Sequence, residues 1–147
     1  MKKLTVLAVS AVLLAGCAAH TEIGPRDYAV DSFDLIDAEE MNSDVLAAAA
    51  AGEEWPLDAL SVAQRFVKPI YGRYLSIEKV DEPSERPRTT TITIIRGSYL
   101  DDSVWGEWDQ LLLSRQPEGA WLIDEARRAW RCYRGHQTES FGERWCL

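Results

Sequence analysis

The chain has 147 residues, of which 46% are hydrophobic, and a formal net charge of −8 at pH 7. This length suits one domain with a modest core. The acidic balance disfavours a nucleic-acid partner, because nucleic acids are bound by basic surfaces.

The first sixteen residues have the features of a secretory signal peptide. Lys2 and Lys3 form a positively charged start, and an apolar run follows over residues 4–15. A membrane-spanning helix needs about 20 apolar residues, so this shorter run predicts an export signal rather than a permanent anchor. We therefore assign residues 1–16 to a signal peptide.

The signal ends in Leu14-Ala15-Gly16-Cys17, which resembles the lipobox of bacterial lipoproteins. The resemblance implies that a diacylglycerol is attached to the Cys17 thiol and that cleavage before it frees an amine for acylation. Several acyl chains hold a protein stably on a membrane. Ala18 follows where Asp would signal inner-membrane retention, so we expect a location in the envelope, at the outer membrane if two membranes are present. An ordinary signal with a coincidental cysteine is the alternative.

The other two cysteines predict a disulfide. Export leads to an oxidising compartment, where an odd cysteine is a liability. With Cys17 consumed by lipid, Cys132 and Cys146 remain as a pair. Closing a loop of about 15 residues should stabilise the fold by about 3 kcal/mol, because it restricts the unfolded chain.

A tether and two helices are expected next. Residues 17–33 form the predicted tether, polar and broken by Gly24-Pro25, and residues 34–147 form the single domain. Residues 37–40 resemble a capping box, and apolar positions at helical spacing predict a helix over 38–51. A second apolar stripe predicts a helix over 57–67, which Pro69 ends.

After Pro69 the hydrophobic period changes from helical to alternating. Four strand-like runs fall within residues 71–80, 89–96, 104–115 and 120–132. The link Gln116-Pro117-Glu118-Gly119 between the last two runs predicts a hairpin. The expected fold is α+β: N-terminal helices packed on a curled, four-stranded antiparallel sheet, with a disulfide-closed C-terminal loop. This order is similar to cystatin-like and NTF2-like folds, an analogy that carries no function.

The hairpin permits a prediction of register. If Arg115 faces Ala120, four favourable pairs lie opposite each other on the two strands. They are the aromatic pair Trp105 with Trp130, the salt bridge Glu107 with Arg128, the apolar pair Leu113 with Leu122 and the cation–π pair Trp108 with Arg127. Alternation then puts Trp105 and Trp130 on one face and Trp108 and Trp121 on the other. Both faces cannot be the inner face of a two-layer domain, so some tryptophans are exposed or covered by the disulfide loop.

Few residues suggest catalysis. Asp101 and Asp102 could act as general acid and base with His136, the imidazole of the folded part. The alternative is that both carboxylates belong to a turn and accept backbone N–H bonds before a strand. No CxxC or HExxH pattern occurs, so neither a metal nor a cofactor is expected.

Binding candidates lie near the C-terminus. Trp108, Arg127 and Arg131 belong to a segment rich in tryptophan and arginine, which suits a glycan, peptide or protein partner or an anionic ligand. A tryptophan-built core with ordinary salt bridges is the alternative.

A second resemblance concerns the C-terminal segment. The series Trp130-Arg131-Cys132-Tyr133-Arg134-Gly135-His136…Phe141…Cys146, preceded by residues 100–107, resembles a family of uncharacterised bacterial secreted proteins over residues 55–147. This resemblance implies no activity. We expect a membrane-anchored, non-enzymatic binding module of the envelope. The alternatives are a small enzyme or ligand pocket around Asp101, Asp102 and His136, and an inhibitor of a cationic enzyme such as lysozyme.

Overall fold

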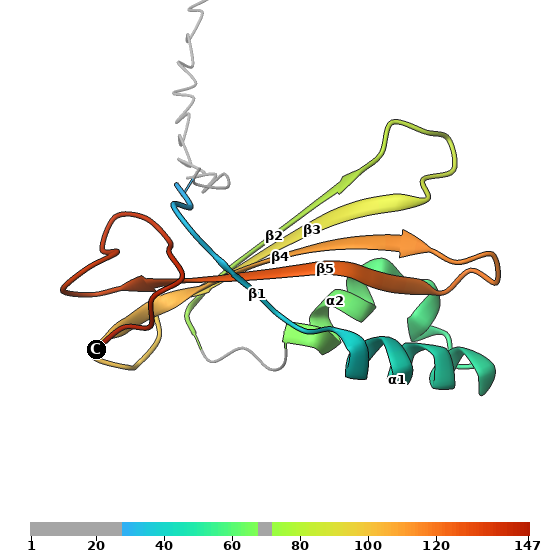
Figure 1. Cartoon of the computed structure of the whole chain (residues 1–147), viewed down its shortest axis with the longest axis horizontal. Helices are drawn as coiled ribbons and strands as arrows, with labels where there is room; N and C mark the ends of the chain where they lie inside the picture. Colours follow the sequence, from blue (N-terminus) through green and yellow to red (C-terminus); the bar gives the residue numbers. More distant parts are fainter. Residues whose placement is uncertain (1–27, 68–71) are drawn as a thin grey trace, which may run out of the picture.

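The computed structural model describes residues 28–67 and 72–147, which form helices on one face of an open antiparallel sheet (Figure 1). The sheet has five strands in the order β1-β5-β4-β3-β2. In chain order the elements are β1 (Asp34–Leu35), α1 (Glu39–Ala50), a 3₁₀ turn (Trp55–Leu57), α2 (Ala59–Val67), β2 (Tyr74–Asp81), β3 (Thr89–Gly97), β4 (Val104–Arg115) and β5 (Trp121–Cys132).

Both predicted helices are confirmed, within two residues at each end. The capping box predicted Asp37 as the N-cap of α1, but the N-cap is Ala38, one residue later, and no side chain caps it. Asp37 instead accepts a bond from the Glu39 N–H at 2.9 Å. The apolar faces of the helices pack on the sheet through a core that includes Val45, Val62, Ile92, Ile94, Leu111 and Leu113. Figure 1 shows α1 and α2 beneath only one end of the sheet. The other end of that face is left for the cavity described below.

The sheet differs from the prediction in its edge and shape. The predicted meander is present as β2 to β5, but a fifth strand, β1, pairs antiparallel with β5, and the sheet is open rather than curled. Two residues are too few to show an alternating pattern, so β1 left no signal in the sequence.

Part of the predicted tether belongs to the domain. Val30 forms a parallel bridge with Phe141, and the Asp31 N–H donates to the Phe141 carbonyl at 2.8 Å. Residues 28–33 therefore pack on the fold, because Tyr28 and Val30 supply apolar cover for a sheet face that the helices do not reach. The predicted signal peptide and residues 17–27 of the tether lie outside the described residues.

The predicted pairing of β4 with β5 is wrong: the partner of each β4 residue lies one residue further along β5 near the turn, two residues further from Leu112 to Gly106, and one residue further at Val104. Arg115 pairs with Trp121 because Ala120 closes the turn, where its carbonyl accepts the Gln116 N–H at 2.7 Å. A bulge then adds Asp124 to β5. Sequence spacing cannot reveal such an extra residue, because each bulge shifts every later pair.

These shifts redistribute the tryptophans between the faces. A second bulge at Trp105 places its ring in the same cluster as Trp108 and Phe141, on the face away from the helices. A side chain at Gly97 would collide with this ring, since a Cβ there would lie 2.7 Å from it. Trp121 and Trp130 point to the helix side. The prediction that Trp105 shares a face with Trp130, and Trp108 with Trp121, is therefore wrong. The C-terminal loop does cover Trp105 and Trp108, through Phe141.

The C-terminal loop is closed by the predicted disulfide between Cys132 and Cys146, whose Cα atoms lie 5.5 Å apart. Gln137 holds the loop internally: its side-chain amide donates to the carbonyls of Trp130 and Arg144 at 3.0 Å each. The disulfide and these bonds fix Trp145 beside Trp130. Their position defines one wall of the cavity.

Candidate ligand-binding cavity

A cavity of about 670 Å³ lies on the helix side of the sheet, at the end that the helices leave open. We call it the Trp145 cavity. Its lining residues come from the two residues before β2, from β3 to β5, from the loop 98–103 and from the disulfide loop: Gly72, Arg73, Arg96, Tyr99, Leu100, Asp101, Val104, Glu107, Trp130 and Trp145. The volume falls in the range of small-molecule sites.

Aromatic and aliphatic side chains form the walls. Trp130 and Trp145 meet edge to face with ring centroids 4.2 Å apart. Trp145 is nevertheless 55% exposed, and Leu100 is 88% exposed. Large apolar side chains that remain open to solvent beside a cavity are a feature of binding sites.

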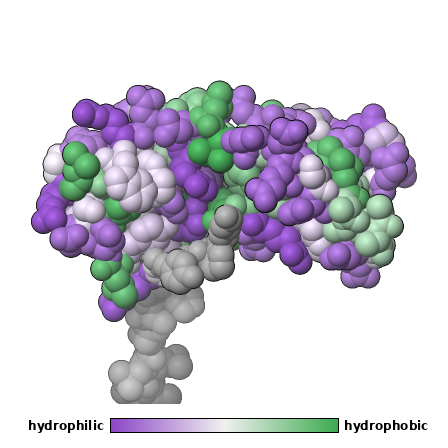
Figure 2. All heavy atoms as spheres, turned by 60° about the horizontal axis from the view of Figure 1, so that its bottom comes forward, coloured by the Kyte–Doolittle hydropathy of each residue, from purple (hydrophilic) through white to green (hydrophobic). Residues whose placement is uncertain are grey.

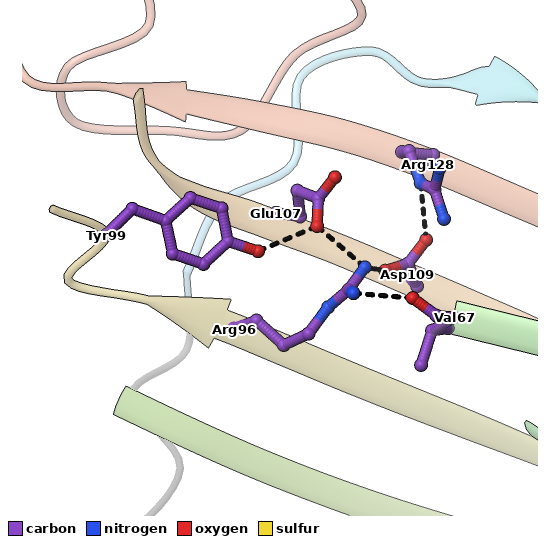
Figure 3. Close-up of polar contacts among 6 residues, drawn as sticks. All are labelled: Val67, Arg96, Tyr99, Glu107, Asp109 and Arg128. Carbon is purple, nitrogen blue, oxygen red and sulfur yellow. Dashed lines mark hydrogen bonds and ion pairs between the residues drawn. The ribbon is translucent and has the colours of Figure 1, made fainter. Parts of the chain in front are cut away.

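The floor of the cavity is a network of buried charges (Figure 3). Arg96 on β3 is only 4% exposed; its Nη2 pairs with Glu107 Oε2 at 2.7 Å and also with Asp109 Oδ2. Asp109 in turn pairs with Arg128 of β5 at 2.7 Å. Two arginines thus balance two carboxylates, which is the condition under which buried charges are tolerated.

Two further bonds connect the network to its surroundings. Arg96 Nη1 donates to the Val67 carbonyl at 2.6 Å, so a cation lies at the C-terminus of α2, where it is favoured by the helix dipole. The Tyr99 hydroxyl donates to Glu107 at 2.7 Å. Burial, and then the bond to the Glu107 carboxylate, raise the pKa of the Tyr99 phenol well above its usual value. The cavity therefore presents Tyr99 as a neutral phenol.

A second cavity, of about 500 Å³, adjoins the first and shares Arg96 and Glu107 with it. It lies between the sheet, the start of α1 and the end of α2. Its rim carries the carboxylates of Asp37, Glu40 and Asp44. None of the ion pairs between described residues includes these three.

The candidate catalytic residues do not converge in the cavity. Asp101 lines it, but its Oδ1 accepts bonds from the Ser103 N–H and hydroxyl and from the Val104 N–H. The Ser103 and Val104 bonds lower the pKa of Asp101 to about 2, which keeps it ionised and unsuited to act as a general acid near neutrality. Asp102 is paired with Arg134 at 2.9 Å on the surface. Neither Asp102 nor His136 lines either of the two cavities.

The three binding candidates lie outside the Trp145 cavity. Trp108 is buried in the cluster beneath Phe141. Arg127 pairs with Glu125 and lies over the Phe33 ring. Arg131 lies over the Trp105 ring at 4.5 Å and donates to the Thr138 carbonyl. All three hold the face away from the helices together.

Sequence reasoning did not identify Arg96, Tyr99 or Trp145 as cavity residues. Arg96 gave a usable signal, because alternation from Ile92 and Ile94 places this arginine on the apolar face of its strand. A charged residue at such a position requires a partner or a function. Trp145 gave no comparable signal, since its place depends on the folded disulfide loop.

The described residues thus form a two-layer α+β domain with an aromatic cavity over a neutralised charge network. Comparison of the chain with protein-family models, with curated proteins and with solved structures finds no match. No helix within residues 28–67 and 72–147 has the length and apolar character that crossing a bilayer requires. Within the same ranges, no three His, Cys, Asp or Glu side chains are grouped closely enough to hold a metal ion.

Proposed function

We propose that the chain is a lipid-anchored protein of the bacterial envelope whose domain binds a ligand in the Trp145 cavity without transforming it. The single observation that carries the binding role is the cavity itself: exposed Trp145 and Leu100 stand over a floor whose charges are paired. The signal sequence, the lipobox at Cys17 and the disulfide support export and anchoring.

The lining indicates what the ligand must offer. A bulky apolar or flat group, such as a peptide side chain or the face of a sugar, would fill the space between Trp130, Trp145 and Leu100. Arg73 at the rim forms none of the ion pairs between described residues and is available for one polar contact. We therefore propose a protein, peptide or glycan of the envelope as the partner.

A binding role is favoured over catalysis by the state of the polar groups. The carboxylates of Glu107 and Asp109 are held in ion pairs with Arg96 and Arg128, which suits a structural role. The alternative enzyme site needs Asp101, Asp102 and His136 to lie together. Asp101 instead accepts backbone bonds within its own turn, and Asp102 pairs with Arg134.

A second candidate function is inhibition of a cationic enzyme such as lysozyme. The carboxylates of Asp37, Glu40 and Asp44 at the rim of the second cavity favour it, because opposite charge guides association. Its test is binding of the full chain to lysozyme at low and high salt. Binding that weakens with salt and with the triple change Asp37→Asn, Glu40→Gln, Asp44→Asn supports inhibition, and no binding at low salt dismisses it.

The cavity proposal is tested by affinity capture of the native protein from its own envelope, with partners identified by mass spectrometry. Trp145→Ala removes a wall of the cavity. Leu112→Ala is the matched control, because Leu112 is also exposed (40%) but lies on the opposite face of the sheet. We expect the partner to be lost with Trp145→Ala and kept with Leu112→Ala. If both variants capture the same partners, the partner does not bind in the Trp145 cavity.

Anchoring has its own test. Intact-mass analysis of the native product should show loss of residues 1–16 and addition of acyl chains at Cys17. A Cys17→Ser variant should be released from membranes. A native product with an unmodified thiol, found free in the medium, contradicts the anchor.

A further inference from the structure

One end of the domain exposes several large side chains that contain apolar surface, and three of them belong to the loops beside the Trp145 cavity. Leu100 is 88% exposed, Trp145 55% and Tyr133 47%. We call this set the apolar tip. Its members are held together: Leu100 and Trp145 line the same cavity, and the Tyr133 hydroxyl donates to the Tyr99 carbonyl at 3.2 Å. Figure 2 shows hydrophobic and near-neutral surface atoms among hydrophilic ones at this end, where Figure 1 places the C-terminal loop.

The chain from the proposed lipid enters the domain at the same end. Tyr28 packs on Trp105 and Phe141 with ring centroids 5.5 Å and 5.6 Å apart, and Phe141 lies in the same disulfide loop as Tyr133 and Trp145. Cys17 precedes Tyr28 by eleven residues, which span at most about 40 Å when fully extended. A lipid at Cys17 would thus keep this end close to the membrane surface.

We propose that the apolar tip rests in the interfacial layer of the bilayer that holds the lipid of Cys17, so that the Trp145 cavity receives its ligand at the membrane surface. This inference rests on the lipid attachment proposed above. Tryptophan and tyrosine favour the membrane–water interface, because their rings are apolar and their N–H or O–H groups can reach water. The covalent tether makes the contact intramolecular, so a weak preference of three side chains is sufficient.

The charges around the tip decide which kind of lipid matters. Arg73, Arg134 and Arg144 are exposed there, and so are Asp101, Asp102, Glu139 and Glu143, so this end carries no excess of positive charge. The chain without residues 1–16 loses two lysines and carries a net charge of −10. Contact with the membrane therefore depends on apolar insertion rather than attraction to anionic headgroups, and it should be similar on zwitterionic and anionic vesicles.

The experiment measures tryptophan fluorescence of the purified native protein in phosphatidylcholine vesicles whose acyl chains carry bromine, a contact quencher, close to the headgroup. We expect a loss of about one sixth of the emission, because Trp145 is one of six tryptophans. Trp145→Phe should abolish this loss. Trp55→Phe is the matched control, because Trp55 lies in the 3₁₀ turn beneath the other end of the sheet, and it should leave the quenching unchanged.

The same preparation is analysed by intact mass, so the two failures can be told apart. Acylated protein whose emission is unaffected by brominated lipid refutes the tip and keeps the anchor. Native protein without acyl chains refutes the anchor, and the tip proposal fails with it because the contact requires the tether. Quenching that requires anionic lipid, or that persists in Trp145→Phe, also overturns the contact proposed here.

Discussion

Replacing Arg96 by methionine tests whether the buried charge network holds the two layers of the domain together. Methionine keeps the length and apolar stem of the side chain but removes the cation. Glu107 and Asp109 then lose their shared partner, and the Val67 carbonyl at the end of α2 loses its donor. Asp109 is 1% exposed, so water cannot replace the lost interaction there.

The expected cost of Arg96→Met follows from this burial. Removing one partner of a buried ion pair typically costs about 3–5 kcal/mol, because it leaves an uncompensated charge. Arg128 still pairs with Asp109 at 2.7 Å and Tyr99 still donates to Glu107, so we place the loss near 3 kcal/mol, the low end of about 3–5. Against a total stability of about 5–15 kcal/mol for a small domain, such a loss is large.

The assay is urea unfolding of the full chain with its disulfide intact, followed by circular dichroism. Arg96→Met combined with Glu107→Gln should be more stable than Arg96→Met alone, because Glu107 then has no cationic partner and a neutral amide is cheaper to bury than an unpaired carboxylate. Lys79→Met is the control: Lys79 and Asp81 are about one-third exposed (38% and 37%), so its loss should stay below about 1 kcal/mol. A loss of similar size for Arg96→Met and Lys79→Met would refute the reasoning.

Three further outcomes are expected. Because folding raises the pKa of Tyr99, its contribution to stability is full below its usual pKa of about 10 and is lost as the pH rises above that value. Urea unfolding at alkaline pH should therefore show a decline in stability that is smaller in Tyr99→Phe. An unchanged decline in this variant would exclude Tyr99 as the cause. Reduction of the Cys132–Cys146 bond should lower the free energy of unfolding by about 3 kcal/mol, as measured with and without dithiothreitol; no change would mean that the loop is held by its hydrogen bonds alone. Gly106→Ala should lower the free energy of unfolding by about 1–3 kcal/mol, because a Cβ there would lie 2.1 Å from a carbonyl oxygen of β3. Thermal unfolding measures this loss. If the variant unfolds at the same midpoint temperature as the native protein, the two strands are less closely packed than described.

The local patterns of the chain predicted its two helices and the four strands of the meander. Apolar side chains at helical spacing identified α1 and α2, and β-branched runs with a Pro-Gly link identified the strands of the meander. These signals are readable because each depends on neighbours within a few residues. The Cys132–Cys146 bond was likewise predictable, since the parity of the cysteines leaves one pair.

Register and faces were decided only by the tertiary structure. The bulges at Asp124 and Trp105 each add one extra residue to a strand, and no short-range sequence pattern predicts where such a residue falls. Arg128 consequently pairs with Asp109 instead of Glu107, and Glu107 is left to Arg96. A shift of one residue exchanges the faces of all later side chains, so the spacing that predicted the pairs could not place them.

The cavity was set at a still longer range. Arg96 and Glu107 lie on neighbouring strands, whereas Trp145 reaches Trp130 only because the disulfide returns the C-terminal segment to the end of β5. The sequence by itself indicated the two helices and the four strands of the meander, and it predicts a signal peptide and a lipobox. Which side chains meet depended on how those elements pack, because contacts between distant segments require the folded sheet to define their distance.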